Sequence, residues 1–121
     1  MTSNSNTIER FIEVVGTKNV ITNQWGKEPF VMGWRYGKGD ALAVVKPATL
    51  LEMWDVLKVC VTNDVTVIMQ AANTGLTGGS TPFGNDYDRP VVIINTLRIT
   101  SIHLIKNADQ IIALAGSSLY D

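Results

Sequence analysis

The sequence predicts an α/β fold, with a small, mostly parallel sheet and flanking helices. Short apolar runs recur from residue 41 onward, and a helical pattern or turn-forming residues separate them. One helical segment joins the first two runs, which is the connection that parallel strands need. The 121 residues suffice for one small domain, and 45% hydrophobic and 17% charged residues are typical of a globular protein.

An amphipathic helix is expected over residues 7–15. Its apolar residues recur at the spacing of one helical face, namely Ile8, Phe11, Ile12 and Val15. Asn6 or Thr7 can cap the start of this helix, and Gly16 can end it.

Residues 17–40 are expected to be irregular, apart from a short extended piece at residues 20–22, because glycine and proline interrupt them. Residues 33–39 resemble a P-loop but do not match its motif, G-x-x-x-x-G-K-[ST]. Only three residues separate Gly33 from Gly37, and Gly39 stands where the motif has Ser or Thr, so a P-loop is not predicted. With the first helix, this stretch forms the N-terminal unit, residues 1–40. Its aromatic side chains are interpreted as core or loop anchors: Trp25, Phe30, Trp34 and Tyr36.

Five strands and one helix are expected between residues 41 and 115. Residues 41–45 form a buried strand, and Thr49 with Glu52 forms a capping box for a helix that runs to about Thr62. The apolar stripe of this helix is expected at Leu50, Met53, Trp54, Leu57 and Val61. The later strands are expected at residues 65–69, 91–94, 100–105 and 110–115, with turns at residues 63–64 and 107–109.

Residues 70–82 are the most informative part of the chain, because they follow a buried strand without hydrophobic periodicity. They combine glycines with small hydroxyl and amide side chains, which let main-chain N–H groups approach a ligand. Successive N–H groups in such a loop bind anions, and open α/β sheets place ligands at the carboxyl ends of strands. The sequence therefore predicts a phosphate or diphosphate site. The alternative is a flexible surface connection rich in turn formers.

The glycine spacing argues against a Rossmann nucleotide site. Gly75, Gly78 and Gly79 do not match the G-x-G-x-x-G pattern, and residues 83–88 are a second loop rather than a helix. The main-chain concavity, rather than a helix N-terminus, must therefore attract the anion.

Charge and composition exclude several other classes of site. Ten basic and eleven acidic residues leave a net charge of −1, without a basic patch for nucleic acid. Cys60, interpreted as a core residue, and His103 are single, so neither a disulfide nor a zinc site can form within the chain. Asp86 and Asp88 are interpreted as hydrated carboxylates with Arg89 as a partner, so no metal site is predicted. No apolar run is long enough to span a bilayer, and no secretory signal begins the chain.

Two stretches carry a resemblance to a known family. Residues 69–82, Met-Gln-Ala-Ala-Asn-Thr-Gly-Leu-Thr-Gly-Gly-Ser-Thr-Pro, and residues 85–89, Asn-Asp-Tyr-Asp-Arg, resemble the flavin-binding region of bacterial quinone-dependent (respiratory) D-lactate dehydrogenases. The similarity covers residues 35–121. It implies the first half of a vanillyl-alcohol-oxidase-type (PCMH-type) FAD-binding domain, with residues 41–121 as its first subdomain, truncated at the C-terminus.

The resemblance also implies where FAD binds. The pyrophosphate is expected on Ala71, Ala72, Asn73, Thr74 and Gly75, with Gly79 and Ser80 closing the other side. Gly75 and Gly79 are expected to permit positive φ and close approach. Asn73, Thr74 and Ser80 are expected to donate to phosphate oxygens. Residues 70–90 contain neither histidine nor cysteine, so the FAD is predicted to be non-covalent.

The function that the resemblance implies is oxidation of D-lactate to pyruvate by FAD, with electrons passed to membrane quinone. Such an enzyme is expected on the cytoplasmic side of the bacterial inner membrane as a peripheral protein. The chain is interpreted as an N-terminal fragment that stops in the first turn of a helix capped by Ser117 or Ser118. The fragment is expected to be inactive alone, to self-associate and to contain no catalytic residue. Two alternatives stay open: an FAD-dependent dehydrogenase of another 2-hydroxy acid, and a non-catalytic nucleotide-binding module.

Overall fold

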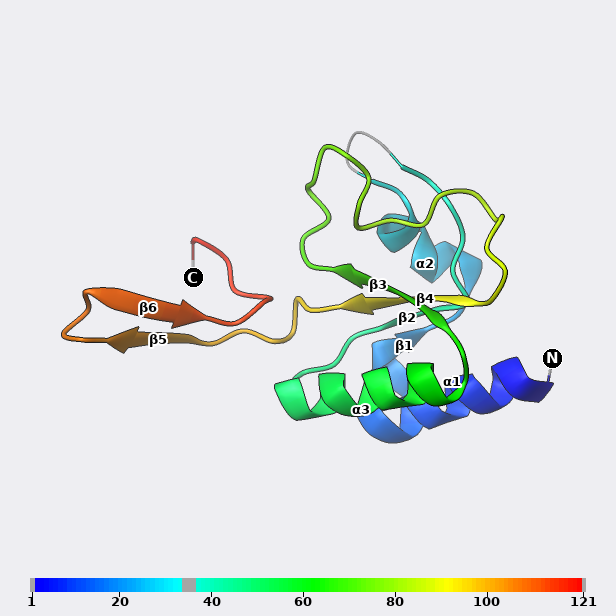
Figure 1. The fold of residues 1–121 in the computed structure, drawn as a ribbon, viewed down its shortest axis with the longest axis horizontal. Helices are drawn as coiled ribbons and strands as arrows, with labels where there is room; N and C mark the ends of the chain where they lie inside the picture. Colours follow the sequence, from blue (N-terminus) through cyan, green and yellow to red (C-terminus); the bar gives the residue numbers. More distant parts are fainter. Residues whose placement is uncertain (1, 34–36, 121) are drawn as a thin grey trace.

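The computed structural model describes residues 2–33 and 37–120. Its main sheet has the strand order β1-β2-β4-β3, formed by Val20–Ile21, Ala43–Val45, Val91–Asn95 and Thr66–Gln70 (Figure 1). β2, β4 and β3 are parallel, while the short edge strand β1 is antiparallel to β2. The expected α/β fold with a mostly parallel sheet is therefore confirmed.

The two strands joined by helix α3 (Leu50–Thr62) are parallel but do not pair with each other. β4 lies between β2 and β3 and pairs with both. The register of β3 and β4 runs from Thr66 opposite Val91 to Gln70 opposite Asn95. The last residues of these two strands therefore lie side by side.

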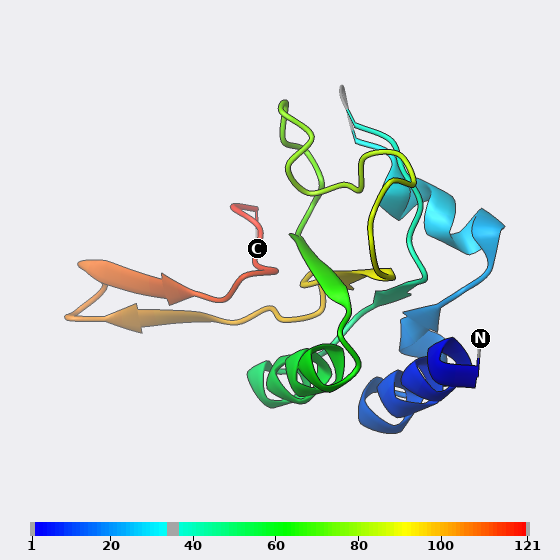
Figure 2. The ribbon, with the colours of Figure 1, turned by 45° about the vertical axis from the view of Figure 1, so that its right-hand side comes forward.

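Helices cover both faces of this sheet. α1 (Thr2–Val15) and α3 pack on one face (Figure 2), in a core cluster with Val45 and Val92. Val44 and Ile93 alternate with these residues and belong to a second cluster, which includes Val31 of α2 (Gln24–Val31). Because β2 and β4 are buried on both faces, they are continuous apolar runs in the sequence.

α1 ends where expected but begins earlier, at Thr2 rather than Thr7. Gly16, with a φ of 87°, ends it and donates its N–H to the oxygen of Ile12 at 2.8 Å. Near the start, the Thr7 hydroxyl donates to the oxygen of Ser3 at 2.8 Å, one turn back. A short 3₁₀ helix, η1 (Thr17–Asn19), leads from α1 into β1.

Thr49 caps α3 as expected, but the return bond from Glu52 goes to Ala48 rather than to Thr49. Thr49 Oγ1 accepts from the N–H of Glu52 at 3.0 Å, and Glu52 Oε1 accepts from the N–H of Ala48 at 3.1 Å. These two bonds satisfy main-chain donors that have no partner within the helix.

The expected apolar stripe of α3 is partly wrong, because only Met53 and Leu57 of it pack against the core. The fully buried residues are Val56 and Cys60, which confirms the interpretation of Cys60 as a core residue. α3 is apolar around much of its circumference, so residue spacing alone did not determine which face the sheet covers. Three residues of the expected stripe are instead exposed: Leu50, Trp54 and Val61.

Helix α2 corrects the expectation that most of residues 17–40 is irregular. Asn23 caps it by accepting from the N–H of Gly26, and Pro29 lies inside it. Lys27 is buried and contacts Asp40 and the oxygen of Ala41. These tertiary contacts outweigh the poor helix propensities of glycine and proline, which is why the sequence did not predict this helix.

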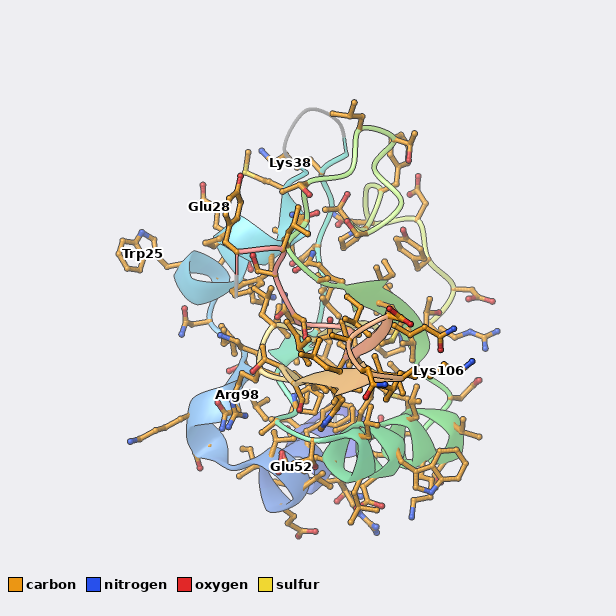
Figure 3. The ribbon with its side chains drawn as sticks, turned by 90° about the vertical axis from the view of Figure 1, so that its left-hand side faces the viewer. Trp25, Glu28, Lys38, Glu52, Arg98 and Lys106 are labelled. Atoms are coloured by element: carbon orange, nitrogen blue, oxygen red, sulfur yellow. The ribbon has the colours of Figure 1, made fainter. Side chains whose placement is uncertain are left out.

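The aromatic residues of the same region do not share one role. Trp25 is 87% exposed and points away from α2 (Figure 3), so the prediction that it anchors the core is wrong. Phe30 is half-buried against the second core cluster, with the Lys46 Nζ 5.6 Å from its ring centre. Trp34 and Tyr36 lie outside the described residues.

A two-stranded sheet follows the main one. β5 (Ile102–Ile105) and β6 (Gln110–Ala113) pair antiparallel, and this hairpin projects beyond the end of β4 (Figure 1). Both expected strands and the turn between them are confirmed, and residues 106–108 in the turn have φ of 52°, 55° and 71°. All residues of both strands are exposed.

Gly116 brings the chain back to the end of β4. A Cβ at this position would collide with the main-chain oxygen of Thr96, and the Gly116 N–H donates to the oxygen of Ile99 at 2.9 Å. Further on, the N–H of Tyr120 donates to Ser118 Oγ at 3.2 Å within a turn. A helix capped at this point stays a prediction.

Candidate functional site

The glycine-rich loop leaves the carboxyl end of β3. Residues 71–90 connect β3 to β4 and run beside the segment that follows α2 (Figure 1). β2, β3 and β4 are parallel, so their carboxyl ends lie at one edge of the sheet. Open α/β sheets bind ligands at this edge.

The first half of the loop presents a row of main-chain donors. Within the described chain, the N–H groups of residues 71–80 donate no hydrogen bond to protein atoms. Such a row can donate to the oxygens of an anion. Most of its residues are exposed: Ala71, Ala72, Thr74, Gly75, Leu76, Thr77 and Gly79.

The glycines of the loop differ from the expectation in their backbone conformation. Positive φ occurs at Asn73 (57°) and Gly78 (76°), and not at Gly75 or Gly79, which corrects the sequence prediction. No heavy atom lies within 4 Å of a Cβ built on Gly75. The absence of a side chain at Gly75 therefore leaves space for a ligand rather than relieving backbone strain.

The side chains of Asn73 and Ser80 already have protein partners. Asn73 Nδ2 donates to the oxygen of Met32 at 2.7 Å, and Ser80 Oγ donates to Asn73 Oδ1 at 2.8 Å. Both residues can still offer an anion their main-chain N–H, and the second hydrogen of Asn73 Nδ2 has no acceptor among the described residues. The exposed Thr74 hydroxyl makes no hydrogen bond within the described chain, so it can donate as expected.

The segment after α2 forms one wall of the loop. Gly37 has a φ of 95°, and a Cβ there would collide with Thr81 Oγ1. A Cβ on Gly39 would lie 2.6 Å from the carbonyl carbon of Pro82. Two glycines outside the loop thus allow residues 78–82 to pack directly against this segment.

Sequence reasoning missed two buried amides beneath the loop. Gln70 and Asn95 are the last residues of β3 and β4, and they are 2% and 1% exposed. Asn95 Nδ2 donates to Gln70 Oε1 at 3.0 Å. A polar amide that ends an otherwise apolar strand was the signal that could have identified them.

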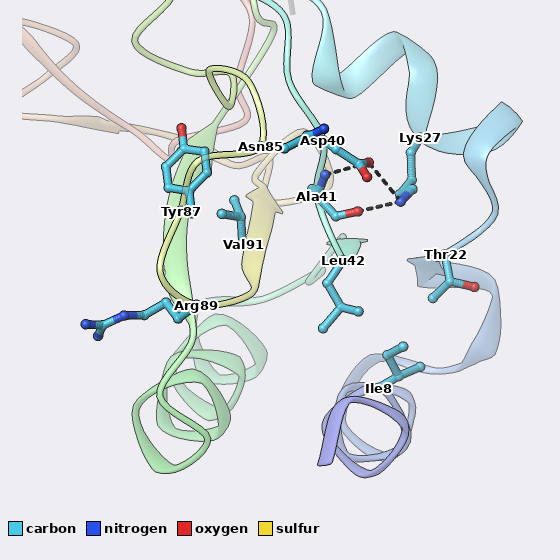
Figure 4. A pocket seen from close by; sticks show the side chains of 10 residues that line it. All are labelled: Ile8, Thr22, Lys27, Asp40, Ala41, Leu42, Asn85, Tyr87, Arg89 and Val91. Atoms are coloured by element: carbon cyan, nitrogen blue, oxygen red, sulfur yellow. Dashed lines mark hydrogen bonds and ion pairs between the residues drawn. The ribbon is translucent and has the colours of Figure 1, made fainter. Parts of the chain in front are cut away.

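A cleft of about 440 Å³ lies near the amino ends of β2 and β4 (Figure 4). Lys27 reaches it from α2, with Nζ 3.2 Å from Asp40 Oδ1 and hydrogen-bonded to the oxygen of Ala41. Burial raises the pKa of Asp40, but hydrogen bonds from the Ala41 N–H and from Lys27 outweigh it, so this pKa is lowered. The Lys27–Asp40 pair therefore fastens α2 to the start of β2.

Cys60 and His103, the two candidates for a covalent bond to flavin, both lie outside the glycine-rich loop. Cys60 faces the core from α3, and burial raises the pKa of its thiol to about 11. His103 lies on β5, where its Nε2 is 2.9 Å from Ser101 Oγ.

Of the two acidic residues expected to pair with Arg89, Asp88 does, while no pair between Asp86 and Arg89 is found among the described residues. Arg89 donates to Asp88 Oδ1 at 3.1 Å and to Asp64 Oδ1 at 2.8 Å. The hydrogen bond from Arg89, together with its charge, lowers the pKa of Asp88. Among the described residues, no three His, Cys, Asp or Glu side chains gather in a group that could hold a metal ion.

Comparison with curated proteins gives high identity over nearly the whole chain. The chain is 60% identical over 93% of its length to the quinone-dependent D-lactate dehydrogenase of Haemophilus influenzae, and 50% identical over 98% to that of Escherichia coli. It is 29% identical over 77% of its length to a mitochondrial D-2-hydroxyglutarate dehydrogenase of Arabidopsis thaliana, covering 17% of that protein. The chain spans about a fifth of the two D-lactate dehydrogenases, 20% and 21%. No family model matches it.

Comparison with solved structures supports the same fold. An alkyldihydroxyacetonephosphate synthase superposes with a TM-score of 0.71 at 13% identity, covering 81% of this chain and 20% of that one. A p-cresol methylhydroxylase superposes with a TM-score of 0.67 at 16% identity, covering 87% and 20%. The chain thus shares the fold of vanillyl-alcohol-oxidase-type (PCMH-type) FAD-binding proteins. By its sequence, the chain belongs to the family of quinone-dependent D-lactate dehydrogenases.

Proposed function

We propose that this chain is the FAD-binding part of a flavoenzyme that oxidises D-lactate to pyruvate and passes the electrons to membrane quinone. The observation that carries the proposal is the row of N–H groups at residues 71–80, which have no partner among the described residues and lie at the carboxyl edge of the sheet. The names of relatives at 50–60% identity supply the substrate and the acceptor. Residues 1–40 and 41–121 are proposed as an N-terminal unit and a first FAD-binding subdomain.

The proposed role of the loop is to hold the diphosphate of FAD. Ala71, Ala72, Asn73, Thr74 and Gly75 would lie along one side of it, with Gly79 and Ser80 on the other. Main-chain N–H groups suit this task because their donors are fixed and no bulky side chain intervenes. Bound FAD would supply the electron-accepting chemistry, while this chain supplies binding and orientation. We assign no catalytic base to it, and we propose that residues 1–121 alone are inactive.

Non-covalent binding of FAD is part of the proposal. Residues 71–90 contain neither histidine nor cysteine. Cys60 is 1% exposed on α3, and His103 lies on the hairpin beyond β4. Denaturation of the flavoprotein should therefore release all of its flavin into the soluble fraction.

A peripheral position on the cytoplasmic side of the inner membrane completes the proposal. The relatives are named for quinone, an acceptor that dissolves in membranes. Among the described helices, none has the length and apolarity to cross a bilayer. Washing membranes with high salt should release the enzyme without detergent if the attachment is peripheral and electrostatic.

The decisive experiment uses the full-length flavoprotein under anaerobic conditions. We expect it to be yellow, and D-lactate to bleach its visible flavin absorption faster than glycolate or 2-hydroxyglutarate. A protein that stays colourless after incubation with FAD would refute the proposal that FAD is its cofactor. If the bound flavin stays oxidised after D-lactate is added, the proposal that D-lactate is the substrate is refuted.

A second candidate is oxidation of D-2-hydroxyglutarate. It is favoured by the 29% and 30% identity to two mitochondrial dehydrogenases of that acid. The higher identity to the D-lactate enzymes places it second. Faster bleaching by 2-hydroxyglutarate than by D-lactate would reverse the order.

A further inference from the structure

Three amide side chains hold the glycine-rich loop from below, and we call them the loop clamp: Gln70, Asn73 and Asn95. Gln70 and Asn95 are paired in register at the ends of β3 and β4. Asn95 Nδ2 donates to Gln70 Oε1 at 3.0 Å and to the oxygen of Ala71 at 3.2 Å. Gln70 Nε2 donates to the oxygens of Phe30 at 2.8 Å and Ser80 at 2.9 Å.

Gln70 therefore connects the two ends of residues 71–80 in the glycine-rich loop. Gln70 directly precedes the loop, and its Nε2 donates to the oxygen of Ser80, the last residue whose N–H has no partner in the described part of the chain. Asn95 Oδ1 accepts from the N–H of Leu97 at 3.1 Å, so the polar atoms of both amides all have partners. A fully satisfied buried network of this kind holds its members in one arrangement.

The orientation of the Gln70 amide follows from its neighbours. Two carbonyl oxygens, those of Phe30 and Ser80, lie within hydrogen-bond distance of Nε2. A flipped amide would face these oxygens with its own oxygen and would place its NH₂ against Asn95 Nδ2. The observed orientation is thus the one that satisfies all of these groups.

Asn73 provides the second half of the clamp. Its left-handed backbone turns the chain, while Nδ2 donates to the oxygen of Met32 and Oδ1 accepts from Ser80 Oγ. Phe30 and Met32 lie at the C-terminal end of α2, where helix carbonyls have no partner within the helix. Asn73 therefore fastens the first part of the loop both to the end of α2 and to Ser80 in the last part of the loop.

We infer that the loop clamp is a positioning device, which sets the curvature of residues 71–80 so that their N–H groups converge on one diphosphate. The inference rests on the proposed function of the loop. Both donors of Gln70 and of Asn95 are already used, so these two amides act through the main chain and not by touching the ligand. A loop ordered in advance loses less conformational entropy on binding, which raises affinity.

The first test is Gln70→Met in the full-length flavoprotein. Methionine keeps the length of the side chain but leaves the Phe30 and Ser80 oxygens unpaired. The Kd for FAD, measured by flavin fluorescence, is expected to rise about ten- to a hundredfold. The ³¹P resonances of the bound diphosphate should also shift, because its donors are no longer held in place.

The second test is Asn73→Gly with Asn63→Gly as its matched control. Glycine keeps the positive φ of position 73 and removes the tether. Asn63 makes the same kind of bond, from Nδ2 to the oxygen of Val59 at 2.8 Å, but at the amino end of β3. Val56→Ala is a second control. It removes a side chain from the core cluster between the main sheet and helices α1 and α3, so it destabilises the fold away from the loop.

We expect Asn73→Gly to weaken FAD binding and shift the ³¹P resonances, while both controls leave these readouts unchanged. Unchanged affinity and ³¹P spectra in both clamp variants, in a protein that binds FAD, would overturn the inference. Equal changes in Val56→Ala would also overturn it, because they would reflect general destabilisation. A wild-type protein without affinity for FAD would instead overturn the proposed function. If Gln70→Met does not fold, the Asn73→Gly and Asn63→Gly pair decides.

Discussion

Gly75 and Gly116 have opposite surroundings, although both are glycines in loops. The space around a Cβ at Gly75 is empty to 4 Å, whereas a Cβ at Gly116 would collide with the main-chain oxygen of Thr96. Packing therefore requires a glycine at position 116. At position 75 it leaves room beside the N–H groups that have no partner in the described chain, where we propose that the diphosphate binds.

Gly75→Ala is expected to leave the free energy of unfolding of the apoprotein within about 0.5 kcal/mol of wild type. Its methyl group should weaken FAD binding, because it enters the space that the ligand needs. Gly116→Ala is the contrasting variant, with an expected loss of about 1–3 kcal/mol from overpacking. Denaturant unfolding and FAD titration measure both effects, and unchanged FAD affinity in Gly75→Ala would count against the site.

Asp40 determines a pH response, also at the scale of one residue. Its pKa in the folded protein lies below the ordinary value of 3.8. A carboxyl of this kind contributes stability that is complete above the ordinary pKa and is lost as pH falls through the folded pKa. Asp40→Asn should therefore lose less unfolding free energy than wild type on acidification below about pH 4. Urea unfolding at a series of pH values measures this, and parallel curves would contradict it.

At the scale of elements, α2 and α3 form for different reasons. α3 carries its start signal in its own sequence, in the hydrogen bonds between Thr49 and Glu52 and between Glu52 and Ala48. α2 contains glycine and proline, and it depends on contacts with distant parts of the chain, such as that of Lys27 with Asp40. The sequence therefore predicted α3 with its cap, but not α2.

Thr49→Ala is expected to lower the free energy of unfolding by about 1 kcal/mol, because the N–H of Glu52 loses its capping oxygen. Thr49→Ser keeps the hydroxyl and should stay close to wild type. Chemical denaturation of both variants provides the measurement. Equal stability of Thr49→Ala and Thr49→Ser would show that the cap is unimportant for this helix.

At the scale of the whole molecule, apolar surface is left uncovered. One face of the hairpin presents Leu104 and Ile111 as direct cross-strand partners, 66% and 61% exposed. α3 adds Trp54 and Val61 on another side. A two-stranded hairpin is marginally stable without a packed face, so this surface favours association.

Residues 1–121 expressed alone are expected to self-associate through the hairpin. Leu104→Lys combined with Ile111→Lys should shift the population toward monomer in sedimentation velocity, because two charges replace the apolar pair. Val61→Lys tests the exposed face of α3 in the same way. Monomer formation by Val61→Lys but not by the hairpin variant would place the contact on α3 instead.

The sequence by itself determined the strands, the α3 cap and the glycine-rich loop, because these depend on neighbouring residues. Periodicity, capping residues and small side chains act over a few positions, and they were readable without a structure. The tertiary structure alone decided that β4 lies between β2 and β3, that α2 forms, and that Gln70 meets Asn95 beneath the loop. Gln70 bonds to Phe30 across 40 positions. Such pairings arise when separate elements pack together, and no local pattern encodes them.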